Sequence, residues 1–464
     1  MATKLEKPDL SFWQLWNLSF AYIGIQLGYS LQGQMSGIYS SLGADDRILP
    51  LLWLGGPLAG IIVQPIIGFA SDRTWVKGLG RRLPFLLAGG LLAALMMALI
   101  VNSKFVAGTW ISAVLLAAIF FLFMDCAFNL SMQPLRSLMG DMVNERQRNK
   151  GFAMQMVLLN IGAIVGFALP FVIHWILNVL GIENEKIGGI NISMSWSFYI
   201  GAAVLLLSVL WSVFRVKEYP PEQFAAYNGI TEKTEKKESF WKILVTTPKV
   251  MYQLAVVQFF VWMGLFCMWN YGLNGIAQNC FGLERINGII DTNSPQFVEA
   301  QNWWGIANAV LSVCALIFSF FWAGLANKFG RKSVYSGALL LGAIGLISMY
   351  FIHDQYVLFA AMALMGIATA VFNGIPFAIV SANVPPQKMG VYMGIFNLTI
   401  VIPQIVFALI GTTLFNMIVG TDGNNVSMLV LSGLFMTFAA VSVVFVKDRK
   451  TTKTEDEPES VLTL

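Results

Sequence analysis

Long apolar segments follow one another along almost the whole chain, and they restrict its fold more than any other feature. We expect about twelve helices, each near the roughly 20 residues that a bilayer crossing requires. Of the 464 residues 57% are hydrophobic and 12% are charged, whereas a soluble domain carries charge on roughly a quarter of its residues. Such a chain cannot cover itself with polar groups, so we predict an all-α membrane protein with lipid as its solvent. The expected spans are 12–38, 48–71, 84–102, 106–138, 151–178, 196–214, 251–278, 302–326, 333–352, 356–381, 389–418 and 426–446.

Basic residues are concentrated in every second loop. The loops on the other side of the expected membrane carry only Arg47, Lys104, Lys186 and Arg285. By the positive-inside rule, the basic side is cytoplasmic. The sequence therefore predicts a multi-pass plasma-membrane protein, with the bacterial inner membrane as its expected location and both termini in the cytoplasm.

Two halves of the chain resemble each other. The motif Gly68-Phe-Ala-Ser-Asp72-Arg73 with Gly80-Arg81-Arg82 follows the second span, and Ala323-Gly-Leu-Ala-Asn327-Lys328 with Gly330-Arg331-Lys332 follows the eighth. Repeats of this spacing predict two six-helix bundles related by an axis along the membrane normal. We expect a first bundle at 1–214, a charged cytoplasmic linker at 215–250, a second bundle at 251–446 and a disordered cytoplasmic tail at 447–464.

The fourth span contains a carboxylate, Asp125, inside the stretch FFLFMDCAFNLSMQPLRSLMGD. An acid at membrane depth is costly and marks a candidate functional site. At about 100° per residue, Asp125, Asn129, Gln133 and Arg136 fall along one helix face, which must line a protein interior or an aqueous path. No other acid falls inside the expected spans, so Asp125 is predicted to be the coupling residue that carries a proton. The alternative is a structural acid satisfied by a neighbouring donor.

The charged motifs after the second and eighth spans are candidates for a conformational latch, because acids and bases there can bridge helix ends. The alternative is basic charge that only sets the topology. For Arg136 the alternatives are a hydrogen bond to substrate, closure of the cytoplasmic end with Asp141, or a side chain that merely reaches the interface. The predicted latch residues are Asp72, Arg73, Gly80, Arg81, Arg82, Asp141, Asn327 and Arg331.

These motifs carry a resemblance to a known family. The loop Gly68–Arg82 looks like the signature loop of the major facilitator superfamily, with a longer insertion before Gly80. PLAGIIVQPIIGFASD at 57–72, the Asp125–Asp141 pattern and Gly390…Pro403-Gln404 resemble the plant sucrose/proton symporters and their bacterial relatives, in the glycoside–pentoside–hexuronide branch. The short central loop and tail depart from the plant pattern, and 279–301 has no match.

The resemblance implies proton-coupled uptake of a disaccharide or related glucoside, such as sucrose or maltose, by alternating access, with Arg136 taking part in transport. Sugars are bound by amides and acids and by stacking on aromatic rings. For a single aromatic side chain, packing against lipid or core is the alternative, whereas an unsatisfied amide in lipid is costly. The predicted substrate-binding residues are Tyr22, Gln26, Tyr29, Asn129, Gln133, Arg136, Gln155, Asn160, Gln258, Trp262, Trp269, Asn270, Asn274, Asn397 and Gln404.

Other functions remain as alternatives: a passive sugar facilitator, a sodium-coupled symporter of the same branch, and a membrane-embedded enzyme or lipid-handling protein. Against an enzyme, the sequence offers no nucleophile–base set, phosphate loop or metal-ligand cluster, and its two histidines and four cysteines are scattered. We therefore expect no catalysis, metal or cofactor. The expected partners are a sugar, a proton and the lipid bilayer, without nucleic acid, and the expected state is a monomer.

Overall fold

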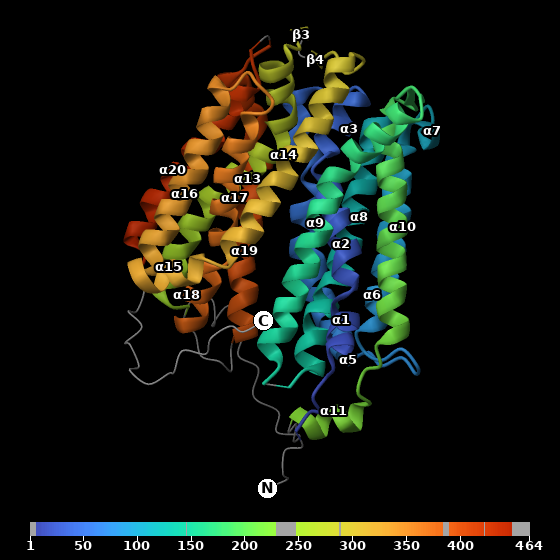
Figure 1. The fold of residues 1–464 in the computed structure, drawn as a ribbon, viewed down its shortest axis with the longest axis vertical. Coiled ribbons are helices and arrows are strands. Elements are labelled where there is room, and N and C mark those ends of the chain that lie inside the picture. The colour runs from blue at the N-terminus through green and yellow to red at the C-terminus, as the bar shows by residue number, and fades with distance from the viewer. Residues whose placement is uncertain are drawn as a thin grey trace.

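A computed structural model describes residues 6–144, 146–228, 247–286, 289–383, 389–421 and 423–447. Long helices run side by side along the molecule, and the only paired strands among these residues are two short hairpins (Figure 1). Eleven segments of the described residues are long and apolar enough to cross a membrane. The predicted all-α membrane fold is confirmed. Parts of the predicted linker (229–246) and tail (448–464) lie outside the described residues.

The first half of the chain forms one group of helices, drawn from blue to green in Figure 1. Its elements are α1 (Phe12–Ser19), α2 (Ala21–Gln32), α3 (Met35–Ser41), η1 (Asp46–Ile48), α4 (Leu49–Leu52), α5 (Gly55–Arg73), α6 (Leu83–Val101), α7 (Ser103–Val106), α8 (Ala113–Met142), α9 (Arg148–Val179), β1 (Lys186–Ile187), β2 (Ile190–Asn191), α10 (Ile192–Arg215) and α11 (Pro221–Asn228).

The second half forms the other group, drawn from yellow-green to red. Its elements are α13 (Lys249–Phe281), β3 (Arg285–Ile286), β4 (Ile289–Ile290), α14 (Pro295–Ser319), α15 (Trp322–Phe329), α16 (Arg331–Ser348), η2 (Met349–Phe351), α17 (Leu358–Phe372), α18 (Ile375–Asn383), α19 (Met389–Ile418), α20 (Val426–Ser442) and η4 (Val443–Phe445).

The first expected span is interrupted. Breaks at Phe20 and Gly33 divide it into α1, α2 and α3, which follow one another along the molecule. This segment is not among the eleven apolar spans. A polar side chain hydrogen-bonds the start of α1, where the Ser11 hydroxyl accepts from the backbone N–H of Gln14.

The expected starts of the fourth and eighth spans were wrong, and in each case the helix begins at a serine N-cap. The fourth span begins at Ala113 rather than 106, because the Ser112 hydroxyl accepts a hydrogen bond from the N–H of Leu115. The eighth begins at Pro295 rather than 302, where Ser294 caps the helix and the proline occupies its first turn. The 279–301 segment, which the family pattern did not match, therefore contains the end of α13, the β3–β4 hairpin and the start of α14.

Close packing within the first half depends on small residues. A Cβ atom at Gly24 of α2 would lie 2.5 Å from the backbone of Leu205 in α10. At Gly28, one turn further on, it would lie 2.5 Å from the ring of Phe128 in α8. Both glycines allow helices to approach closely, and α2 contacts α10 and α8 at these positions.

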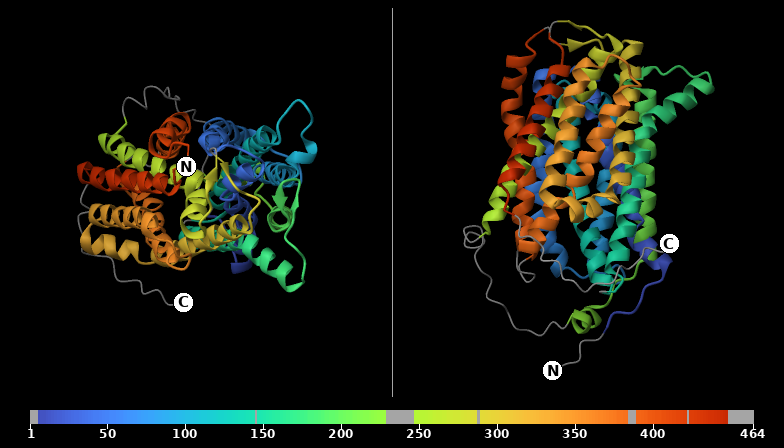
Figure 2. Two further views of the ribbon diagram at one scale, coloured as in Figure 1. Left: turned by 90° about the horizontal axis from the view of Figure 1, so that it is seen from above. Right: turned by 60° about the vertical axis from the view of Figure 1, so that its left-hand side comes forward.

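Viewed along the helices, the two groups lie next to each other (Figure 2). They meet through α9 with α14, α19 with α4 and α5, and α13 with α3 and α4. We call the end of the molecule that carries β3 and β4 the hairpin end. The opposite end, near residues 6 and 447, is the terminal end. The basic motifs after α5 and α15 lie at the terminal end.

Candidate functional site

Asp125 lies in the middle of α8 and is 4% exposed. The side-chain amide of Gln32, at the end of α2, donates a hydrogen bond of 2.6 Å to its Oδ1 atom. The Oδ2 atom is buried and has no hydrogen-bond partner among the described residues. A buried carboxylate with one paired and one unpaired oxygen is unusual, because an unmet hydrogen bond on a buried charged group is costly.

Gly56 of α5 leaves the space that the Oδ2 atom occupies. A Cβ atom at this position would lie 2.8 Å from Oδ2, so any larger residue would displace the carboxylate. All these contacts of Asp125 come from helices of the first half. Sequence analysis missed both Gln32 and Gly56. The sequence carries little signal for Gln32, which lies about 60° from Tyr29 and about 120° from Gln26 around a helix of about 100° per residue.

Arg136 lies about three turns further along α8, where its side chain is exposed. Its guanidinium lies close enough to the hydroxyl of Tyr22 on α2 for the two groups to interact electrostatically. Between these residues and Asp125, the ring of Tyr29 stacks on Phe128 with centroids 4.6 Å apart. The structure thus brings together the predicted residues of the first and fourth spans along the contact between α2 and α8.

Three predicted amides bond their own helices. The side-chain nitrogens of Asn129, Asn160 and Asn270 each donate to the backbone carbonyl four residues earlier, at 2.9, 2.7 and 2.7 Å. The Oδ1 atom of Asn270 is left buried without a described partner. These contacts satisfy the amide nitrogen in an apolar setting, and they give no sign of a converging sugar site.

The remaining predicted amides are dispersed over several helices. Gln258 of α13 accepts a hydrogen bond of 3.2 Å from the Tyr335 hydroxyl. Gln155 of α9 is 1% exposed, and its amide nitrogen has no described partner. The other predicted amides are half-buried or buried: Gln26, Gln133, Asn397 and Gln404.

The predicted tryptophans of α13 lie where the two halves meet. The ring of Trp269 stacks on Trp53 of the first half at 6.4 Å and packs edge-on against Trp262 at 6.2 Å. A hydrogen-bonded chain joins the same two segments. The Trp53 indole N–H donates to the Ser36 hydroxyl at 3.0 Å, and Ser36 donates to the carbonyl of Trp269 at 3.1 Å.

At the terminal end, Asp141 of α8 binds the predicted basic latch. Its Oδ2 atom accepts from Arg81 at 2.7 Å and from Arg82 at 3.0 Å, so Asp141 pairs with these arginines rather than with Arg136. Gly80, which precedes them, has a φ of +96° that favours glycine. The side chains of Asp72 and Arg73 lie outside the described part. In the second half, Asn327 lies exposed on α15 and Arg331 begins α16.

Sequence analysis did not foresee that Glu218, after α10, joins this cluster. Its Oε1 atom accepts the backbone N–H groups of Arg82 and Leu83 at 2.7 and 2.9 Å. Burial raises the pKa of the Glu218 carboxyl above its usual range, and these backbone hydrogen bonds act against that rise. All the described contacts of Asp141 and Glu218 thus join elements of the first half.

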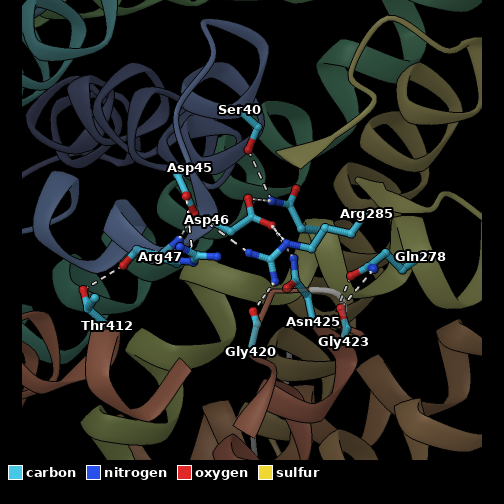
Figure 3. Close-up of polar contacts among 11 residues, drawn as sticks. Ser40, Asp45, Asp46, Arg47, Gln278, Arg285, Thr412, Gly420, Gly423 and Asn425 are labelled. Atoms are coloured by element: carbon cyan, nitrogen blue, oxygen red, sulfur yellow. Dashed lines mark hydrogen bonds and ion pairs between the residues drawn. The ribbon is translucent and has the colours of Figure 1, made fainter. Parts of the chain in front are cut away.

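At the hairpin end, the structure corrects the prediction that Asp125 is the only buried acid of the spans. Asp46, at the start of the second spanning segment, is 1% exposed. Figure 3 shows its carboxylate among side chains from both halves. The amide nitrogens of Asn274 and Asn425 donate to its two oxygens at 2.6 and 2.7 Å. Asn274, predicted to bind substrate, is therefore part of this cluster and also donates to Ser40 at 3.2 Å.

Arg285 completes the cluster around Asp46. Its Nε atom lies 3.8 Å from Asp46 Oδ2, and its side chain is fully buried. It also donates to the carbonyl of Gly420 at 3.1 Å and lies 4.6 Å above the ring of Phe415. Burial lowers the pKa of Arg285, while the carboxylates of Asp46 and Asp45 act in the opposite direction. Sequence analysis read Arg285 only as a basic residue of an outer loop.

Two cavities open at the hairpin end. One of about 500 Å³ is lined by Ser40, Lys104 and Asp291 among others, and a second of about 670 Å³ by His174, Glu299 and Trp303 among others. None of the predicted sugar-binding residues lines either cavity. These cavities therefore do not coincide with the predicted site around Asp125.

The chain thus has apolar spans, polar side chains buried between them and charged clusters at their ends. This architecture is that of a multi-pass membrane transporter. The family model described as Major Facilitator Superfamily matches residues 18–290 and 299–463. The chain belongs to this superfamily.

Similar proteins include plant sucrose transporters. The sucrose transport protein SUC4 of Arabidopsis thaliana is 25% identical over 421 residues, which cover 82% of this chain and 80% of that protein. SUT5 of Oryza sativa subsp. indica is 23% identical over 426 residues, covering 83% and 79%. The predicted resemblance to plant sucrose transporters is therefore confirmed.

Solved structures share the fold. The xylose transporter XylE from E. coli has a TM-score of 0.65 at 14% identity, covering 95% of this chain and 99% of that one. The nucleoside transporter NupG has a TM-score of 0.62 at 14% identity, covering 94% and 98%. The protein is thus a transporter of the major facilitator fold rather than an enzyme.

Proposed function

We propose that the protein is a proton-coupled symporter that imports a disaccharide or related glucoside, such as sucrose or maltose, by alternating access. The observation that carries the proposal is the buried carboxylate of Asp125, with one oxygen bonded to Gln32 and the other beside Gly56 without a described partner. A single carboxyl group in a dry site is sufficient to take up and release a proton. The similarity to plant sucrose transporters supports a sugar as the substrate.

The substrate contacts proposed first are Arg136 and Tyr22, which lie near each other beside the α2–α8 contact. Their hydroxyl and guanidinium groups can hydrogen-bond sugar hydroxyls, and the ring of Trp269 offers an aromatic face. The other predicted sugar-binding residues remain proposals. We further propose that the terminal end faces the cytoplasm, in accordance with the positive-inside rule, and that the protein works as a monomer.

The Asp125→Asn variant in liposomes tests the role of the carboxylate. Asparagine keeps the shape and can still accept the hydrogen bond from Gln32, but it cannot titrate. We expect loss of uphill sugar accumulation driven by a pH gradient, with sugar exchange retained as proof of a folded carrier. Accumulation by the variant at the wild-type level would refute the assignment of Asp125.

The driving ion is tested in the same liposomes. Sodium requires several converging oxygen ligands, whereas the structure places one carboxylate and amide groups here. We expect sugar-dependent proton uptake that a protonophore abolishes and that replacing sodium by choline leaves unchanged. A sodium requirement at constant pH would favour the sodium-coupled alternative, and downhill uptake without proton movement would favour a passive facilitator. Screening mono- and disaccharides identifies the substrate.

A further inference from the structure

The cluster around Asp46 joins the two halves of the molecule. Asp46 belongs to η1 of the first half, whereas its partners Asn274, Asn425 and Arg285 belong to α13, the N-cap of α20 and β3 of the second. The two amide bonds of 2.6 and 2.7 Å are in the range of strong, charge-assisted hydrogen bonds. A single side chain thus connects three elements of the opposite half (Figure 3).

Other contacts between the halves lie at the same end. The Thr412 hydroxyl of α19 donates to the carbonyl of Arg47 at 2.7 Å. The ammonium group of Lys186, on β1, binds Thr292 and Asn293, between β4 and α14. These contacts surround the Asp46 cluster at the hairpin end. In the structure this end is therefore held closed.

We propose that Asp46 is a gating residue of the transport cycle: its ionised carboxylate locks the two halves at the hairpin end, and proton uptake by Asp46 releases them. This proposal does not depend on Asp125 or on the identity of the substrate. The described contacts of Asp125 with Gln32 and Gly56 lie within the first half, whereas a rocking motion of one half against the other must break those of Asp46.

The geometry explains why the ionised form is needed. Both carboxylate oxygens accept from amide N–H groups, and the guanidinium of Arg285 lies beside them. A protonated Asp46 would lose its charge next to Arg285 and would present an O–H donor to groups that now donate to it. The other titratable or charged groups that face the cluster are Asp45, Arg47 and the Tyr271 phenol of α13.

Distance measurements between spin labels test the proposal. In a cysteine-free full-length protein in nanodiscs, labels at the exposed positions Glu183 and Asp354 report on the hairpin end, and labels at Arg146 and Lys328 on the terminal end. The Asp125→Asn substitution is included throughout, so that this carboxyl group cannot contribute to a pH response. Distances are compared between about pH 8 and pH 5, which brackets the range in which buried carboxyl groups titrate.

Asp45→Asn is the matched control for Asp46→Asn. It removes the same charge one residue away, and Asp45 also lies 3.9 Å from Arg285. Unlike Asp46, the Asp45 side chain is about one-third exposed. It accepts a hydrogen bond from the N–H of Arg47, and an asparagine at this position can accept the same bond. For Asp46→Asn we expect about a tenfold or larger rise in the ratio of open to closed hairpin ends, since two hydrogen bonds to a charged group are weakened. The terminal-end distance should shorten in the same molecules.

Acidification should open the hairpin end when Asp46 is present, and it should have no further effect in the Asp46→Asn protein. The proposal is overturned if Asp46→Asn and Asp45→Asn give the same label distances. It is also overturned if acidification changes these distances as much in the Asp46→Asn protein as in the protein that retains Asp46. If Asp46→Asn fails to fold, Asn425→Ala replaces it. That variant removes one of the two amide donors, and unchanged distances there would equally overturn the proposal.

Discussion

Removing the hydrogen bond from Gln32 to Asp125 should change the pH dependence of transport. In Gln32→Leu the donor 2.6 Å from Asp125 Oδ1 is lost, and the side chain that replaces it is apolar and similar in size. A hydrogen bond to a charged group contributes about 1.5–3 kcal/mol. Since this bond favours the ionised carboxylate, its loss favours the protonated form by that amount.

The size and sign of the effect follow from this free energy. One pH unit corresponds to about 1.4 kcal/mol, so the midpoint of the pH profile should move by about one to two units. Because the protonated carrier persists to higher pH, the movement is towards the alkaline side. The assay is the initial rate of sugar uptake into liposomes at a series of external pH values, with the internal pH and the membrane potential held constant.

Gln34→Leu is the matched control. Gln34 lies two residues further along the chain and is 1% exposed, so the same substitution buries the same apolar side chain without touching Asp125. Its pH midpoint should stay at the wild-type value. A midpoint in Gln32→Leu that is unchanged, or displaced to the acid side, would refute the assignment of Asp125 as the proton site.

Two further predictions concern charged groups nearer the terminal end. Arg136→Lys keeps the charge but loses the planar guanidinium fork, which can form paired hydrogen bonds, so we expect sugar uptake to fall by about tenfold or more; unchanged uptake kinetics would favour a merely interfacial arginine. Because burial raises the pKa of Glu218, its contribution to stability is complete below the ordinary carboxyl pKa and is lost as pH rises through the raised value. Glu218→Gln keeps an acceptor for the N–H of Arg82, so its melting temperature should decline less with rising pH than that of the wild type. An identical decline in the two proteins would show that Glu218 does not cause this pH dependence of stability.

Helical periodicity and hydropathy were sufficient to predict the spans and the buried position of Asp125. They failed to predict where some helices begin, because a single N-cap side chain sets the start of a helix and an average over the segment does not detect it. Ser112 and Ser294 set the true starts of α8 and α14, and no hydropathy average contains that information. The continuous first span was likewise divided at Phe20 and Gly33.

Contacts between distant helices could not be predicted from one sequence. Periodicity placed Tyr22 and Arg136 on suitable helix faces, but nothing in their spacing indicated that they lie near each other. Asp46 was missed because it lies two residues before the apolar run that begins at Ile48, and it therefore looked like a loop residue. Its burial depends on Asn274 and Asn425, more than 200 residues away along the chain.

The two buried acids differ in which half supplies their partners, and this difference separates their roles. Asp125 contacts Gln32 and Gly56 of its own half, so its surroundings move with it when the halves rotate as rigid bodies. Asp46 is held by the opposite half, and the same rotation must break its bonds. Under the two proposals, protonation of Asp125 therefore changes the charge of its pocket in either conformation, whereas protonation of Asp46 acts directly on the equilibrium between the conformations.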